Sequence, residues 1–101
     1  MQANYLFLFG QDDQASPPKA AQAIIHQLVS QAKIKPKYAI ETLEGVGHFI
    51  DLPNSPPVSV SNHVLFPRDL VYMGGSDINL HSVGQLTAWG KLLDFFRTVL
   101  C

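Results

Sequence analysis

Residues 5–13, with the sequence YLFLFGQDD, decide the fold, because an unbroken apolar run ends at Gly10 and two aspartates follow it at once. An apolar run without alternation is typical of a strand that is covered on both faces, as in a parallel sheet. The run stops at Gly10, so a loop is expected from Gly10 to Ala15. The stretch therefore predicts a buried strand whose carboxyl end carries Asp12 and Asp13.

A helix and a second strand are predicted next. Ser16 is expected to cap the helix, and Pro17 suits its first turn. Lys35-Pro36 ends the helix, because the residue before a proline avoids helical backbone angles. A second strand is predicted over Tyr38–Leu43. The apolar face of the helix follows a spacing of three and four residues and consists of Ala21, Ile24, Ile25, Leu28, Val29 and Ala32.

The rest of the chain is predicted as a long loop followed by a helix. Residues 49–77 contain four prolines, and a loop of this length is usually functional or mobile. Some extended structure is expected over Val58–Phe66, and Gly74-Gly75 closes the loop. The last helix is predicted from about His81 to Leu100 and must pack on something large. Its apolar stripe consists of Leu86, Trp89, Leu93, Phe96 and Leu100, widened by Leu92, Phe95 and Val99.

The order strand, helix, strand, helix indicates an α/β fold with parallel strands and a crossover helix. Two parallel strands need cover on both faces and both edges. The composition also indicates more apolar surface than a free-standing domain of this size would expose. In this chain 47% of residues are hydrophobic and 15% are charged, whereas about 25% are charged in an average domain. We therefore expect residues 1–101 to be a fragment or the tail of a larger domain.

Asp13 and His48 are the candidate catalytic residues. Each follows a predicted strand, and parallel strands bring their carboxyl ends to one rim, about 4.8 Å apart for neighbours. A carboxylate there can accept the Nδ1–H of an imidazole, so that Nε2 can take a proton from a nucleophile. In α/β-hydrolases the triad runs nucleophile, acid, histidine along the chain. Asp13 and His48 match its last two members.

Simpler interpretations remain open. Asp12 and Asp13 are also typical of a pair that caps a helix and complements its dipole, and His48 is also typical of an ordinary loop histidine. A nucleophile is missing, because the chain has no Gly-x-Ser-x-Gly elbow. Ser76 is interpreted as a turn or cap residue, and the terminal Cys101 is a poor nucleophile candidate.

Other classes of function find little support. Lys and Arg total seven without clustering and the net charge is −1, so no nucleic-acid partner is expected. No metal site is expected, because His63 and His81 lack ligand spacing and His26 is interpreted as a structural or surface residue. No apolar run suits a membrane span and no signal peptide is seen. The last three residues are not a peroxisomal signal of the SKL kind, and the cytoplasm is the favoured compartment.

Several motifs in a fixed order carry a resemblance to a known family. They are residues 10–13 (GQDD) after an apolar strand, residues 47–53 (GHFIDLP), Gly74-Gly75, and Gln85 with Ala88-Trp89 ahead of Phe95-Phe96. From about Asn4 to Leu100 the chain resembles the carboxy-terminal part of the acyl-CoA thioesterase and bile acid-CoA:amino acid N-acyltransferase family. Ser76-Asp77 departs from the usual residues after the glycine pair.

The resemblance implies that residues 1–101 are the last part of an α/β-hydrolase domain. It implies Asp13, rather than Asp12, as the acid and His48 as the base, with a Ser or Cys nucleophile on an elbow upstream and an amino-terminal β-sandwich domain. The substrate would be a fatty acyl-CoA or bile acyl-CoA thioester, with no cofactor. Water, or glycine or taurine in the transferases, would resolve the acyl-enzyme.

This chain alone is expected to be inactive, because the nucleophile elbow is not in it. Its partner would be the missing amino-terminal part of the same domain. The alternative is a catalytically inactive fragment or pseudoenzyme that acts as a binding module. A third class, a Mg²⁺-binding phosphoacceptor domain, needs further strands ending in Asp and Lys, and the sequence shows neither.

Overall fold

Two parallel strands lie between two helices in the computed structural model, which describes residues 3–55, 60–62, 65–66, 68–75 and 77–100. Strand β1 (Asn4–Gly10) pairs in parallel with β2 (Lys37–Leu43), from Asn4 opposite Lys37 to Gly10 opposite Leu43. Helix α1 (Pro18–Gln31) connects them. After β2 come β3 (Val60–Asn62), β4 (Leu70–Tyr72) and helix α2 (Ile78–Leu100). The predicted α/β class and the parallel pairing are confirmed.

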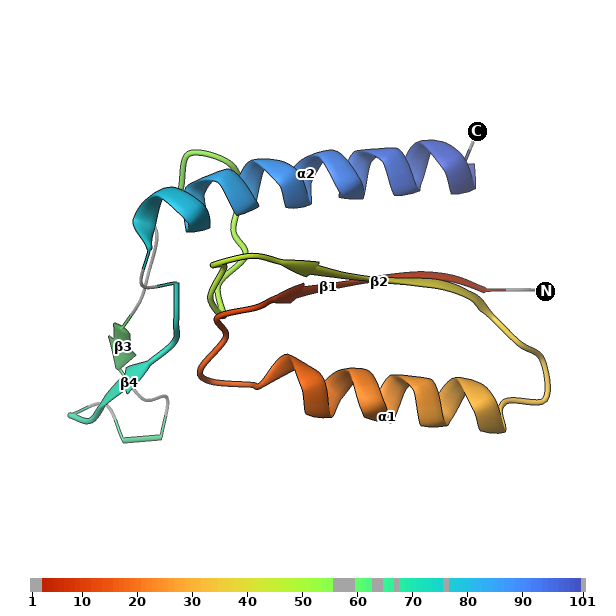
Figure 1. The fold of residues 1–101 in the computed structure, drawn as a ribbon, viewed down its shortest axis with the longest axis horizontal. Helices are drawn as coiled ribbons and strands as arrows, with labels where there is room; N and C mark the ends of the chain where they lie inside the picture. Colours follow the sequence, from red (N-terminus) through yellow and green to blue (C-terminus); the bar gives the residue numbers. More distant parts are fainter. Residues whose placement is uncertain (1–2, 56–59, 63–64, 67, 76, 101) are drawn as a thin grey trace.

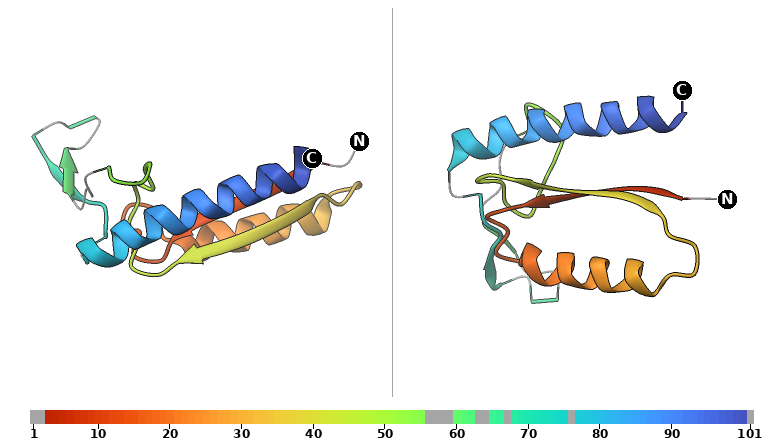
Figure 2. Two further views of the ribbon diagram at one scale, coloured as in Figure 1. Left: turned by 90° about the horizontal axis from the view of Figure 1, so that it is seen from above. Right: turned by 45° about the vertical axis from the view of Figure 1, so that its right-hand side comes forward.

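The elements form three layers, with α1 on one face of the β1–β2 sheet and α2 on the other (Figure 1). The two termini lie at one end of the sheet, and the carboxyl ends of both strands lie at the opposite end. Figure 2 shows β3 and β4 at that same end of the molecule, near the starts of α1 and α2. The loops that follow the two strands are therefore gathered at one rim of the molecule.

The predicted cap of the first helix is wrong. Pro17 occupies the N-cap position and makes no side-chain cap hydrogen bond. The carboxylate of Asp13 instead accepts the backbone N–H groups of Ala15 and Ser16, at 3.0 and 2.8 Å. The carboxylate of the preceding turn thus accepts the backbone N–H groups that lead into the helix. The hydroxyl of Ser16 is not needed as a cap there.

Helix α2 begins at Ile78, earlier than the predicted start at His81. Asp77 accounts for the difference, since its side chain accepts the N–H of Leu80 at 3.0 Å and its carbonyl accepts that of His81 at 2.9 Å. This is the geometry of an aspartate N-cap. Farther along, Lys91 forms an ion pair of 3.1 Å with Glu41 and so joins α2 to β2.

The long connection between β2 and α2 holds a small antiparallel pair. Val60, Ser61 and Asn62 pair with Tyr72, Val71 and Leu70. The expectation of extended structure over Val58–Phe66 is met at Val60–Asn62, whereas residues 58–59 and 63–64 lie outside the described part of the chain. The partner strand was not predicted.

The buried core is small and lies at the rim end of the sheet. Its apolar members are Leu43, Val46 and Ala88, with Leu8 and Ile50 packed against them. Close approach of α2 is possible because Gly84 sits directly on the side chain of Val46, where a β-carbon would collide. Gly84 and Ala88 therefore allow α2 to approach closely, while His81 and Gln85 are the other buried positions of the same helix.

The apolar stripe predicted on the last helix is largely exposed among the described residues. Trp89 is 39% exposed and Phe96 is 47% exposed, and Leu86, Leu93 and Leu100 are exposed as well. Helix α2 is apolar on more than one side, and its buried positions are His81, Gly84, Gln85 and Ala88. On α1, similarly, Ile24 and Leu28 from the predicted face are exposed.

Candidate active site

Asp13 and His48 meet at the rim, as predicted. The Oδ2 atom of Asp13 lies 3.1 Å from Nδ1 of His48. The carboxylate belongs to the loop after β1, and the imidazole belongs to the loop after β2. The Asp13 side chain is 12% exposed and that of His48 is 37% exposed, so the acid is sheltered while the imidazole reaches the surface.

The two oxygens of Asp13 have different partners. Oδ1 accepts the backbone N–H groups of Ala15 and Ser16, and Oδ2 faces His48. The loop thus holds the carboxylate through one oxygen and presents the other to the imidazole. An ionised carboxylate can only accept, so the shared proton belongs on Nδ1 of His48, and Nε2 is then able to take a proton.

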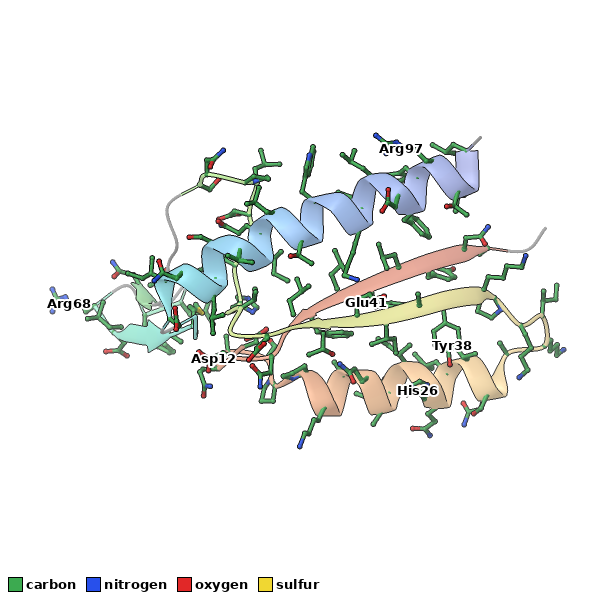
Figure 3. The ribbon with its side chains drawn as sticks, turned by 45° about the horizontal axis from the view of Figure 1, so that its top comes forward. Asp12, His26, Tyr38, Glu41, Arg68 and Arg97 are labelled. Atoms are coloured by element: carbon green, nitrogen blue, oxygen red, sulfur yellow. The ribbon has the colours of Figure 1, made fainter. Side chains whose placement is uncertain are left out.

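Asp12, the neighbouring residue, points elsewhere. Its Oδ2 accepts the backbone N–H of Gly75 at 3.0 Å, and its Oδ1 accepts the amide of Gln14 at 2.9 Å. Figure 3 shows Asp12 at the rim, near the start of α1 and the β3–β4 pair. The structure therefore brings Asp13, and not Asp12, to the histidine.

The backbone of the two loops is joined directly. The N–H of Gln11 donates to the carbonyl of Leu43, and that of Asp12 donates to the carbonyl of Val46, each at 2.9 Å. The side chain of Gln11 also accepts the N–H of Gly45 at 3.0 Å. The parallel ladder thus continues past the ends of the strands and fixes the two loops relative to one another.

Residues 73–75 form a third segment that binds both loops. The carbonyl of Met73 accepts the N–H of His48 at 2.9 Å and that of Gln14 at 3.4 Å. Gly74 forms a single antiparallel bridge with Asp13. Gly74 and Gly75 have φ angles of +86° and +73°, a region that favours glycine. The glycine pair noted in the sequence therefore holds the site together.

His81 lies beside the site, although its sequence pattern did not predict a role there. Its side chain is fully buried, and its Nδ1 accepts the backbone N–H of Gly47, the residue before His48, at 3.0 Å. The available signal was a pair of large polar residues four apart, His81 and Gln85, near the start of the last helix. A spacing of four places both side chains on one face.

The remaining candidates lie away from the dyad. His26 on α1 contacts the hydroxyl of Tyr38 on β2, with 3.0 Å between Nδ1 and the oxygen (Figure 3). In the described residues, no group of three or more His, Cys, Asp or Glu side chains is placed to hold a metal ion. His63, Ser76 and Cys101 lie outside the described residues.

Among the described helices, none combines the length and the hydropathy that a membrane span requires.

The Asp13–His48 pair has no nucleophile beside it in the described chain. No hydroxyl or thiol is found in hydrogen-bonding contact with His48 in residues 3–55, 60–62, 65–66, 68–75 and 77–100. The arrangement can therefore orient an imidazole and stabilise its positive charge, and the described residues place no hydroxyl or thiol against it.

Comparison with known proteins identifies a family and several relatives. The profile of the family described as BAAT / acyl-CoA thioester hydrolase C terminal matches residues 1–101. The chain is 35% identical over 97 residues to acyl-coenzyme A thioesterase 1 of Rattus norvegicus, covering 95% of the chain and 22% of that protein.

Two further relatives extend the comparison. Mitochondrial acyl-coenzyme A thioesterase 2 of Mus musculus is 33% identical over 95% of the chain and 20% of its own length. Peroxisomal succinyl-coenzyme A thioesterase of Mus musculus is 29% identical over 90% of the chain and 21% of its own length. The chain spans about a fifth of the length of these relatives.

Proposed function

The chain belongs to the BAAT / acyl-CoA thioester hydrolase C-terminal family, and from that premise we propose that it supplies the acid and the base of an acyl-CoA thioester hydrolase. Asp13 is the acid and His48 the base of a Ser/Cys-His-Asp triad. The observation that carries the proposal is the 3.1 Å contact between Asp13 Oδ2 and His48 Nδ1 at the rim of a parallel sheet.

In the proposed reaction, Nε2 of His48 takes the proton of a Ser or Cys side chain as that side chain attacks the thioester carbonyl. Asp13 stabilises the imidazolium. The proton then passes to the sulfur of CoA, which leaves as the thiol, and an acyl-enzyme remains. Water, deprotonated by His48, attacks the acyl-enzyme, and His48 returns that proton to the departing Ser or Cys side chain, so the products are a carboxylic acid, CoA and the regenerated nucleophile.

The nucleophile belongs, in this proposal, to the part of an α/β-hydrolase domain that precedes the chain. Elements β1, α1, β2 and α2 would be its last two strands with their helices. The length of the relatives supports this, because about four fifths of each lies outside the match. The exposed stripe around Trp89 and Phe96 also supports it, because an apolar surface of this kind calls for cover.

Hydrolysis is favoured over transfer to an amine because the matched relatives are named thioesterases. The acceptor is therefore proposed to be water, and the substrate an acyl-CoA. Product analysis with glycine and taurine present distinguishes the two reactions, since a transferase would form an N-acyl product in place of the free acid.

The experiment uses the natural protein that carries this chain. CoA release from acyl-CoA substrates of several lengths is measured for the wild type, His48→Ala and His26→Ala. We expect His48→Ala to lower kcat by about 10³-fold or more, with unchanged unfolding. His26→Ala is the matched control, because His26 is an exposed histidine on α1 that contacts Tyr38, and it should retain turnover.

Full activity in a correctly folded His48→Ala variant would remove the proposal. Absence of any thioester hydrolysis by the natural protein, with retained binding of acyl-CoA, would instead favour a catalytically inactive binding module. The exposed apolar stripe on α2 gives that alternative its one structural support.

A further inference from the structure

We propose that His81 is a positioning residue that holds the loop of His48 through the backbone of Gly47; the proposal rests on the proposed role of His48. His81 lies on α2 and is 0% exposed. Its Nδ1 accepts the N–H of Gly47 at 3.0 Å across the fold. The peptide that follows Gly47 carries the N–H of His48, so an anchor at Gly47 acts one residue from the base.

The hydrogen bond determines the protonation state of His81. A backbone N–H donates, so Nδ1 must be an unprotonated acceptor, and a neutral ring then carries its proton on Nε2. The same contact identifies Nδ1 as the ring nitrogen that holds the backbone of Gly47. In the described structure the ring makes no other hydrogen bond, since Nε2 is buried without a protein partner.

The ring is held between two backbone segments of the site. A β-carbon on Gly75 would lie 2.7 Å from Nδ1 of His81, and one on Gly47 would lie 2.6 Å from the backbone of Gly74. His81 therefore packs where the His48 loop meets the glycine pair. With the Met73 carbonyl holding the N–H of His48 at 2.9 Å, two successive N–H groups of this loop are fixed.

The start of α2 places the ring in this position. Asp77 caps the helix and its carbonyl accepts the N–H of His81 at 2.9 Å. Gly84, one turn on, seats the helix against Val46. Val46 and Gly47 directly precede His48. Helix α2 therefore contacts the loop of His48 in two ways, by packing of Gly84 on Val46 and by the hydrogen bond from Gly47 to Nδ1 of His81.

A simple filling role for His81 is the alternative. An apolar side chain would fill the same space more cheaply, but it would leave the buried N–H of Gly47 without an acceptor. The two roles differ in what they require. Filling requires volume, whereas positioning requires an acceptor atom at the place of Nδ1.

The test compares three variants in the natural protein that carries this chain. In His81→Asn the side-chain oxygen can occupy the place of Nδ1, and in His81→Gln it extends toward the place of Nε2. His81→Leu supplies volume without an acceptor. We expect kcat to fall by about 10- to 100-fold in His81→Leu and His81→Gln with KM within about twofold, because small displacements of a catalytic group are costly. His81→Asn should recover most of the loss.

A second measurement does not depend on turnover. Nitrogen-15 NMR of the histidine rings in the wild type should show His81 neutral, with Nδ1 unprotonated. Equal kcat for His81→Asn and His81→Gln, or a protonated Nδ1, would overturn the proposal, and the NMR result decides the matter if the variants do not fold. Failure of the proposed function can be distinguished from failure of this proposal. It would appear as full turnover in His48→Ala, independently of the results for the His81 variants.

Discussion

At the scale of single residues, the site depends on which of two adjacent aspartates turns toward the histidine. Asp13 has one oxygen bound by the loop and the other on His48. The carboxylate of Asp12 accepts hydrogen bonds from Gly75 and Gln14. The two carboxylates are chemically identical and one residue apart, so their roles differ only through the backbone that orients them.

The first prediction compares these two aspartates in the natural protein. Asp13→Asn should lower kcat by about 10³- to 10⁴-fold, because an amide in place of the carboxylate no longer stabilises the imidazolium or its tautomer. Asp12→Asn should cost far less, since an amide oxygen can still accept the N–H of Gly75. Steady-state kinetics of CoA release measure both, and equal losses would contradict the assignment.

A second residue-scale prediction concerns the glycine pair. Gly74→Ala should destabilise the protein by about 1–3 kcal/mol, because its φ angle is +86° and the added carbon meets the carbonyl of Asp12. Gly90→Ala on α2 is the matched control. Apart from its chain neighbours and the nearby backbone of its own helix, no described atom lies within 4 Å of its β-carbon position, and alanine in a helix interior is favoured by roughly 0.5–1 kcal/mol.

Denaturant unfolding of the natural protein measures both glycine changes. The two substitutions add the same atoms, so opposite signs would separate the strained turn from the helix. A neutral Gly74→Ala would show that residues 73–75 do not hold the two loops together in solution.

At the scale of elements, α2 serves the site from its first turn. Asp77 caps the helix and places His81 under the loop of His48. The same helix carries Gly84 and Ala88 at the positions nearest the sheet. Its first turns therefore belong to the rim, whereas the exposed apolar stripe runs along the helix from Leu86 to Leu100.

The third prediction tests the cap. Asp77→Ala should lower stability by about 1 kcal/mol, because the N–H of Leu80 loses its acceptor. It should also lower kcat, since the first turn carries His81. Asp94→Ala is the control, because Asp94 lies late in the same helix, where it pairs only weakly with Arg97 at 3.6 Å on the surface. Thermal unfolding and kinetics together check the prediction.

An Asp77→Ala variant with normal stability and normal turnover would show that α2 starts independently of its cap. A variant that loses stability while keeping kcat would show that the start of α2 does not affect the position of His48. That result would argue against the positioning role of His81.

At the scale of the whole molecule, the described chain has much apolar surface and a small core. Only three apolar residues are buried among those described, namely Leu43, Val46 and Ala88. Large exposed apolar side chains occur on both helices, including Leu28 at 62% and Leu93 at 36%. Surfaces of this extent are typical of contact with other protein.

The fourth prediction concerns the 101-residue chain expressed alone. It should self-associate and bind a hydrophobic dye, because the stripe on α2 is uncovered, and it should show no thioester hydrolysis. Leu93→Gln with Phe96→Gln should reduce the association, measured by size-exclusion chromatography. Ser82→Gln with Thr87→Gln, which changes polar positions of the same helix, should leave it unchanged. A monomer with no dye binding would contradict the prediction.

The sequence by itself determined the local elements and their order: the strand before Asp12, the helix after Pro17, the strand before Gly45 and the long apolar helix. Propensity, proline and apolar spacing act over a few residues, so these features can be recognised without a fold. The pairing of Asp13 with His48 followed from parallel strands, and the preference for Asp13 over Asp12 came from the resemblance.

Tertiary structure alone decided the direction of each side chain and the side of α2 that meets the sheet. The orientation of Asp13 depends on a loop held by the strand beside it and by residues 73–75. The burial of His81 depends on the close approach that Gly84 allows to Val46. Contacts between residues far apart in the chain set these features, and no local pattern contains them.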